Sequence, residues 1–111
     1  MAMGLTTGLW VSAQVRLCDI AFIPATIVRR GDPDAGTVLL KLNRFEQGVT
    51  VYAQTTSSGD EPTWSRGTGP TPVSEAEADA YIERQVKYDP DVWVLEIEDR
   101  RGQYKMDGKV V

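Results

Sequence analysis

The order of apolar and polar positions along the chain predicts two helices and several short strands. The clearer helix begins at Ser74-Glu75-Ala76-Glu77, a capping box in which Ser74 accepts from the Glu77 amide and Glu77 reaches back. Asp89-Pro90 ends it, because proline lacks an amide hydrogen and biases the residue before it away from helical angles. We therefore expect a helix over Glu75–Tyr88.

An earlier segment, residues 9–22, fits two periodicities. Its apolar residues recur at helical spacing opposite a polar stripe, but they also alternate with polar residues as in a half-buried strand. The length of about 14 residues favours a helix, and Pro24 ends it. The residues expected to face the core are Leu9, Ala13, Leu17 and Ile20, with Trp10 and Ala21 beside them.

Strands are predicted where β-branched and aromatic residues gather between turn signals. The charged turn Arg29–Gly36 is expected to form the tip of a β-hairpin, and residues 56–62 an exposed polar loop. The regular spacing indicates an antiparallel meander. The expected strands are Thr26–Arg30, Thr37–Asn43, Val49–Thr55, Thr63–Arg66 and Val92–Glu98.

Together these elements predict an α+β fold in one small domain over residues 1–111. An N-terminal helix precedes a mainly antiparallel sheet of four to five strands, and the helix at about 75–88 is followed by a final strand. Residues 100–111 are charged and punctuated by glycine, which predicts a flexible tail beyond an ordered core of about 7–99.

The charge and the cysteine content limit the kinds of ligand and the cellular compartment that the sequence predicts. Twelve Lys and Arg residues against sixteen Asp and Glu residues give a net charge of −4, which argues against a surface that coats phosphates. Cys18 is the only cysteine, so no intramolecular disulfide forms, as suits a reducing compartment. No run reaches the roughly 18 apolar residues that span a bilayer, and residues 9–23 lack the features of a signal peptide. We expect a cytoplasmic protein with no membrane partner.

Candidate catalytic chemistry is sparse. The chain has no histidine, which excludes the usual Ser-His-Asp and Cys-His arrangements within it, and no glycine-rich phosphate loop. The sequence therefore assigns no catalytic residue, no cofactor site and no metal site. Asp32 with Asp34, and Asp89 with Asp91, could bind a hard cation if their two turns met, which would suit a small metal-dependent enzyme. Ordinary turn chemistry explains the same residues and is favoured.

The candidate residues for a partner lie in the turns and beside the polar loop. Trp10 and Trp93 fit a core role, whereas Trp64 borders the polar loop and is expected to be partly exposed. The candidate set is Arg29, Arg30, Asp32, Asp34, Trp64, Asp89 and Asp91.

A basic patch near the expected hairpin would suit a weak nucleic-acid binder. Asp32 and Asp34 would partly cancel its charge, and stacking aromatic residues are not interleaved with it. Solvated surface charges are the favoured explanation, so we expect no nucleic-acid partner. The residues concerned are Arg29, Arg30, Lys41, Arg44 and Arg66.

Several segments, taken together, resemble a family of small bacterial proteins catalogued as domain of unknown function 1491. The resemblance covers about residues 7–102 and implies a bacterial, single-domain protein; it implies no activity, cofactor or catalytic residue. The segments are Thr7–Val11, the turn Arg29–Gly36 with Val38–Lys41, Glu77–Tyr81 and Asp89–Asp99.

The function expected from the sequence is therefore a non-enzymatic interaction or regulatory module. An exposed strand at the edge of the sheet would pair with an unknown protein partner or with a second copy of the chain.

Overall fold

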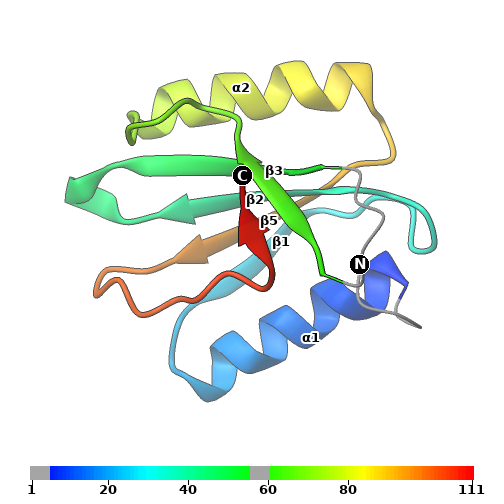
Figure 1. The fold of residues 1–111 in the computed structure, drawn as a ribbon, viewed down its shortest axis with the longest axis horizontal. Coiled ribbons are helices and arrows are strands. Elements are labelled where there is room, and N and C mark those ends of the chain that lie inside the picture. The colour runs from blue at the N-terminus through cyan, green and yellow to red at the C-terminus, as the bar shows by residue number, and fades with distance from the viewer. Residues whose placement is uncertain (1–5, 56–60) are drawn as a thin grey trace.

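The computed structural model describes residues 6–55 and 61–111, which form three layers (Figure 1). Helix α1 (Thr7–Ile20) covers one face of a central sheet, and helix α2 (Glu75–Tyr88) covers the other. The predicted α+β class is confirmed, and α2 has the predicted bounds. The polar loop predicted at residues 56–62 lies mostly outside the described residues.

The sheet has six strands in the order β1-β5-β2-β3-β4-β6. The predicted meander is present in β2, β3 and β4, which pair antiparallel. The sheet as a whole is mixed, because β5 runs parallel to β2 and β6 runs parallel to β4. The strands are β1 (Ala25–Arg29), β2 (Val38–Asn43), β3 (Val49–Thr55), β4 (Thr63–Arg66), β5 (Trp93–Glu98) and β6 (Lys109–Val110), with a short 3₁₀ helix η1 (Phe45–Gln47) between β2 and β3.

The Arg29–Gly36 turn is not the tip of a hairpin, so that prediction is wrong. Strand β5 lies between β1 and β2 and pairs with both. The reason lies in the composition of residues 92–97, which are buried on both faces apart from Glu96. A strand that is apolar on both faces is most stable inside the sheet with a layer on each side, so it occupies the place between β1 and β2.

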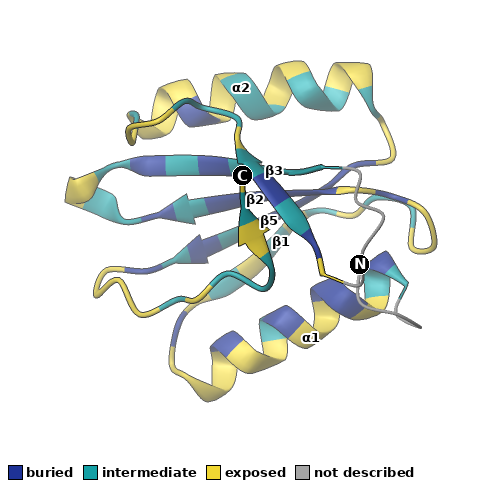
Figure 2. Cartoon of the chain, viewed as in Figure 1, coloured by how far each residue is buried: buried dark blue, intermediate teal, exposed yellow. Residues whose placement is uncertain are grey.

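Helix α1 packs on the sheet through a different face from the one predicted. Trp10, Val11 and Cys18 are buried, whereas Leu9, Leu17 and Ile20 are each more than half exposed. The exposed positions of α1 lie on the side away from the sheet (Figure 2). The helix itself is present as expected, capped by Thr6, whose hydroxyl accepts from the Leu9 amide.

The C-terminal segment differs from the predicted flexible tail. It crosses the α1 face of the sheet and ends in β6, with Tyr104, Met106 and Val110 packed against the core. Asp107 accepts from the indole N–H groups of both Trp10, through its carboxylate at 2.7 Å, and Trp64, through its carbonyl at 2.8 Å.

Trp64 is fully buried and its ring centroid lies 5.5 Å from that of Trp10. The prediction that Trp64 is partly exposed and available to a partner is wrong, because the C-terminal segment covers the strand that carries it.

Neither helix in the described part of the chain is long and apolar enough to cross a membrane.

Candidate functional site

The two Asp-Pro-Asp turns lie side by side at one end of the sheet. The Asp32 amide donates to the Asp91 carbonyl at 2.9 Å, and the Trp93 indole N–H donates to the Asp32 carbonyl at 2.8 Å. The Arg29 guanidinium donates to the Pro90 carbonyl at 2.6 Å. The structure therefore brings together the segments that carry most of the predicted partner-binding residues.

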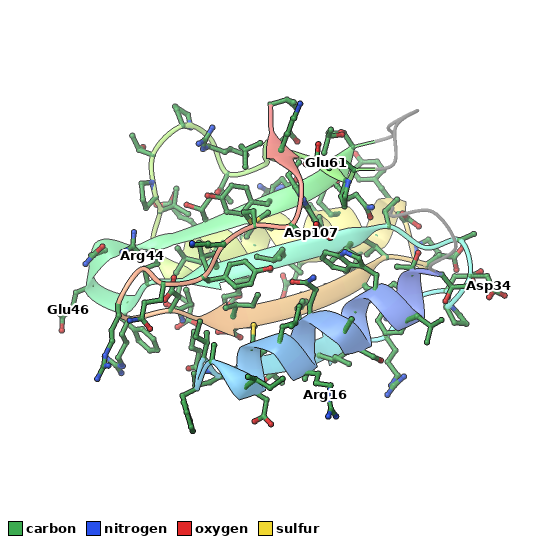
Figure 3. All side chains as sticks on the ribbon, turned by 60° about the horizontal axis from the view of Figure 1, so that its bottom comes forward. Arg16, Asp34, Arg44, Glu46, Glu61 and Asp107 are labelled. Carbon is green, nitrogen blue, oxygen red and sulfur yellow. The ribbon has the colours of Figure 1, made fainter. Side chains whose placement is uncertain are left out.

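The carboxylate of Asp32 serves its own turn. Its Oδ1 accepts from the backbone amides of Asp34 at 2.8 Å and Ala35 at 3.2 Å. These two hydrogen bonds stabilise the charged form and lower the pKa of Asp32. The Asp34 side chain is exposed and points to the outside at this end (Figure 3).

Asp89 plays the same part in the second turn. Its Oδ1 accepts from the Asp91 amide at 3.0 Å, and the Thr37 hydroxyl donates to its Oδ2 at 3.4 Å. No group of three or more metal-ligating side chains gathers within residues 6–55 and 61–111. The turns thus meet through backbone atoms, while the leading carboxylate of each turn is held by hydrogen bonds.

The basic residues grouped from the sequence are dispersed. Arg30 lies over the Trp93 ring, 5.9 Å from its centroid, at the end of the sheet that holds Asp34. Arg44 lies at the opposite end (Figure 3). Lys41 is buried on the α2 face, where its ammonium pairs with Asp79 at 2.8 Å. The fold does not build one continuous basic patch from this set.

Strand β1 forms an edge of the sheet with one side unpaired in the described chain. The Glu98 amide donates to the Pro24 carbonyl, so alternation along the antiparallel pair turns the backbone groups of Ala25 and Ile27 outward. A groove of about 400 Å³ separates this strand from α1, with Val15 and Arg16 among the helix residues that line it.

A larger pocket of about 560 Å³ lies at the opposite end of the sheet from the Asp-Pro-Asp turns. Three segments far apart in the sequence form it: the corner between α1 and β1, the turn after β2, and the loop after β5. The aromatic and charged side chains that line it are Phe22, Phe45, Glu98, Asp99, Arg100 and Arg101.

Phe22 has an unusual backbone at the end of α1. The Ile23 amide donates to the Cys18 carbonyl and the Phe22 amide to the Asp19 carbonyl, which makes a Schellman motif with Phe22 at its left-handed position. Glycine normally fills that position, and phenylalanine adopts it here with φ 59°. The strain costs about 1 kcal/mol, yet the residue is 93% exposed and gains almost no burial.

Phe45 repeats this feature in the turn after β2, with φ 57°. The Asn43 side chain accepts from the Phe45 amide at 2.9 Å and holds the turn. The Arg100 guanidinium lies over the Phe45 ring, 3.7 Å from its centroid, a close cation–π contact. Thus both non-glycine residues with positive φ in the described chain are phenylalanines that line this pocket.

Phe22 and Phe45 are not among the candidate site residues predicted from the sequence. A signal for Phe22 existed: the helix ends before Pro24 without a glycine to take the left-handed position, so a bulky residue must adopt it. No local signal indicated that Phe45 and Arg100 would meet, because they lie 55 positions apart in the sequence.

Comparison with known proteins places this fold in a family. A family model described as "Protein of unknown function (DUF1491)" matches residues 5–107. A crystal structure and an NMR structure of a DUF1491 family protein from Caulobacter crescentus are both 37% identical to this chain with a TM-score of 0.82. The crystal structure covers 98% of this chain and 99% of its own, and the NMR structure 99% of each.

A solution structure of a protein from A. tumefaciens is 25% identical, with a TM-score of 0.74 and coverage of 86% of each chain. Comparison with curated proteins finds no match. The solved relatives thus come from bacteria, as the resemblance implied. Since the family model spans most of its length, the chain belongs to the DUF1491 family, whose function is unknown.

Proposed function

We propose that this protein is a non-enzymatic interaction module that binds an extended segment of a partner protein along the free edge of β1. The observation that supports this most directly is the outward direction of the Ala25 and Ile27 backbone groups. An extended peptide pairs with such an edge through main-chain hydrogen bonds and adds a strand to the sheet.

The groove beside the edge supports the same proposal. In an added strand, alternate side chains point to opposite faces, so one set would enter the groove of about 400 Å³ between β1 and α1. Val15 supplies an apolar wall there, and Arg16 and Asp19 supply opposite charges. Main-chain pairing would provide affinity, and the groove would select the side chains of the partner.

A separate partner suits this edge better than a second copy. The regular part of the free edge covers only Ala25–Ile27, because the register shifts between Ile27 and Arg29. Self-pairing of so short a segment buries far less than the roughly 800 Å² per partner of a stable interface. A partner segment that also fills the groove buries more.

We also infer a cytoplasmic location. The single thiol, Cys18, is buried on the inner side of α1, and burial, with the Asp99 charge as a smaller cause, raises its pKa. A protein whose only cysteine is an inert, buried thiol suits a reducing compartment.

In-cell photo-crosslinking tests the proposed function. A photoreactive phenylalanine analogue at Val28, which is 56% exposed on β1, should yield a discrete adduct with a partner protein. The same analogue at Tyr88, 86% exposed at the end of α2, should yield none and serves as the matched control.

An Ala25→Pro change makes the crosslinking test specific for strand addition. It removes one outward amide hydrogen but leaves the pairing of β1 with β5 in place, so we expect the Val28 adduct to fall several-fold while the fold is retained. An adduct with the mass of two copies of this chain, or equal adducts at Val28 and Tyr88, would contradict the proposal.

A further inference from the structure

The pocket at the end of the sheet opposite the Asp-Pro-Asp turns has the dimensions of a small-molecule site. Its volume of about 560 Å³ falls within the range of roughly 300–1,000 Å³ typical of ligand pockets. It lies where Ala21–Pro24, Phe45 and the loop over residues 98–103 converge. A site built from three separate segments is fixed by the tertiary fold and not by one local turn.

Two strained aromatic residues mark this pocket. Phe22 and Phe45 both adopt a left-handed backbone, at φ 59° and 57°, and both line it. Strain of this kind persists where the surrounding structure enforces it, and it concentrates at binding sites. Neither ring is fully buried, so packing in the core does not account for phenylalanine at these positions. A flat ligand that stacks on an exposed ring would account for it.

The charged groups around the pocket favour an anion. Asp99 is buried, and its carboxylate accepts from the backbone amides of Gln103 at 2.8 Å and Tyr104 at 3.0 Å, so it holds the loop and is not free to meet a ligand. Glu98 is the other carboxylate in the lining, which also includes the guanidinium groups of Arg100 and Arg101.

Arg44 adds a third guanidinium behind the loop. The absence of a side chain at Gly102, which has φ +66°, lets the Arg44 guanidinium pack against the backbone there. The Nε of Arg44 is buried and has no hydrogen-bond partner in the described structure. The guanidinium groups of Arg100 and Arg101 therefore line a site with a single uncommitted carboxylate, and that of Arg44 lies nearby against Gly102.

We propose that this pocket binds a planar aromatic molecule that carries an anionic group. The Phe22 ring provides a stacking surface at the mouth. Arg100 is held in place by its contact with Phe45 and presents planar N–H donors that suit a carboxylate or a phosphate. The pocket shares Ile23 and Pro24 with the groove beside β1 but does not include Ala25 or Ile27, so its ligand does not depend on a partner at that edge.

Titration of the full ¹⁵N-labelled chain with 2-naphthoate tests the proposal. We expect saturable shifts of the amide signals of Phe22, Phe45 and Gly102. Two related compounds should each bind at least about fivefold more weakly: cyclohexanecarboxylate, which lacks an aromatic face, and 2-naphthalenemethanol, which lacks a charge. The reason is that aromatic stacking and a charge-assisted hydrogen bond each contribute to the free energy of binding. Absence of saturable shifts up to millimolar 2-naphthoate, or equal binding of cyclohexanecarboxylate, would overturn the proposal.

Two variants connect the binding to the named residues. Phe22→Gly removes the ring and relieves the left-handed strain, so it should raise the Tm by about 3 °C while weakening 2-naphthoate binding at least about fivefold. Arg100→Gln should weaken binding similarly, whereas Arg84→Gln, at an exposed arginine on α2 outside this pocket, should leave it unchanged. Full binding by the stabilised Phe22→Gly variant would refute the role of the ring.

Discussion

Gly31 and Gly36 allow the two Asp-Pro-Asp turns to pack against each other. A Cβ on Gly31 would lie 2.7 Å from Cδ1 of Trp93 and still closer to the Asp91 carbonyl oxygen, and one on Gly36 would also overlap that oxygen. The reason for glycine here is close approach of two backbones. The Arg29–Gly36 turn thus packs against the second Asp-Pro-Asp turn and fixes the position at which β5 starts.

A Gly31→Ala substitution should destabilise the fold by about 2 kcal/mol, because the added methyl group forces the two turns apart and disturbs the hydrogen bond from the Trp93 indole to Asp32. Urea unfolding followed by tryptophan fluorescence measures the change.

Gly8→Ala is the matched control for that substitution. Gly8 lies in the first turn of α1 and faces the same loop, but its added Cβ would lie 3.4 Å from Pro33, an ordinary contact. Alanine is the better helix former, so this variant should be slightly more stable than the parent chain. Equal stabilities for the two variants would show that the turns are not packed as closely as described.

At the residue scale, turn chemistry was readable from the sequence and exposure was not. Asp32 and Asp89 form turns as their Asp-Pro context predicts. Trp64 was misjudged because its neighbours in sequence are polar, while the segment that buries it lies more than 40 residues further along the chain. Phe22 was not predicted because glycine normally fills the left-handed position at a helix end, and the only signal was the absence of a glycine before Pro24.

At the scale of elements, the capping signals placed α2 correctly, but periodicity misjudged the inward face of α1. The true inward face includes Gln14, which a hydrophobic pattern counts as polar. The Tyr104 hydroxyl donates to its side chain at 3.0 Å, so the amide is satisfied inside. A buried polar residue such as Gln14 depends on a hydrogen-bond partner that is distant in the sequence. The pattern of apolar and polar residues within one helix carries no information about that partner.

The contact between α2 and the sheet is organised by a buried charge. The Lys41 side chain is 6% exposed, and its ammonium lies 2.9 Å from Glu75, 2.8 Å from Asp79 and 3.7 Å from Glu96. Asn43 on the same strand donates to Glu96 at 3.3 Å. Lys41 therefore joins β2, β5 and the first turns of α2.

Lys41→Met should cost about 2 kcal/mol of stability. The apolar replacement fills similar space, but it leaves Glu96 and the two helix carboxylates without their cation; Glu75 and Asp79 are more than half exposed and regain water, which limits the loss. Urea unfolding at pH 7 measures this. Lys109→Met, which breaks an exposed pair with Glu61 at 4.0 Å, should change stability by less than about 0.5 kcal/mol.

The stability difference between the parent chain and Lys41→Met should depend on pH. Burial alone would lower the pKa of Lys41, but hydrogen bonds to Asp79 and Glu75 and the charge of Glu96 outweigh it and raise the pKa above 10.5. The stability that Lys41 contributes is thus complete below pH 10.5, the pKa of an unperturbed lysine. It is lost as the pH rises through the higher pKa that Lys41 has in the folded protein. The difference between parent chain and Lys41→Met should therefore narrow above pH 10.5; a constant difference would argue against this network.

At the scale of the whole molecule, the order of the strands depends on long-range pairing, which the sequence did not show. Strand β5 separates β1 from β2, and β6 adds the last residues of the chain to β4. Local patterns identify each strand but not its neighbours, since pairing depends on which strands are apolar on both faces and on what covers each one. The predicted α+β class is therefore confirmed, whereas the strand order could not be predicted from local patterns.

Deletion of residues 104–111 tests whether the C-terminal segment belongs to the core. Loss of Tyr104, Met106 and Val110, with the acceptor of the Trp10 indole on Asp107, should lower stability by at least about 3 kcal/mol and shift tryptophan emission to longer wavelength. Lys105→Ala, an exposed site in the same segment, should change neither. A flexible tail predicts instead that the shortened chain unfolds at the same urea concentration as the full chain, because a segment without native contacts contributes nothing to the folded state.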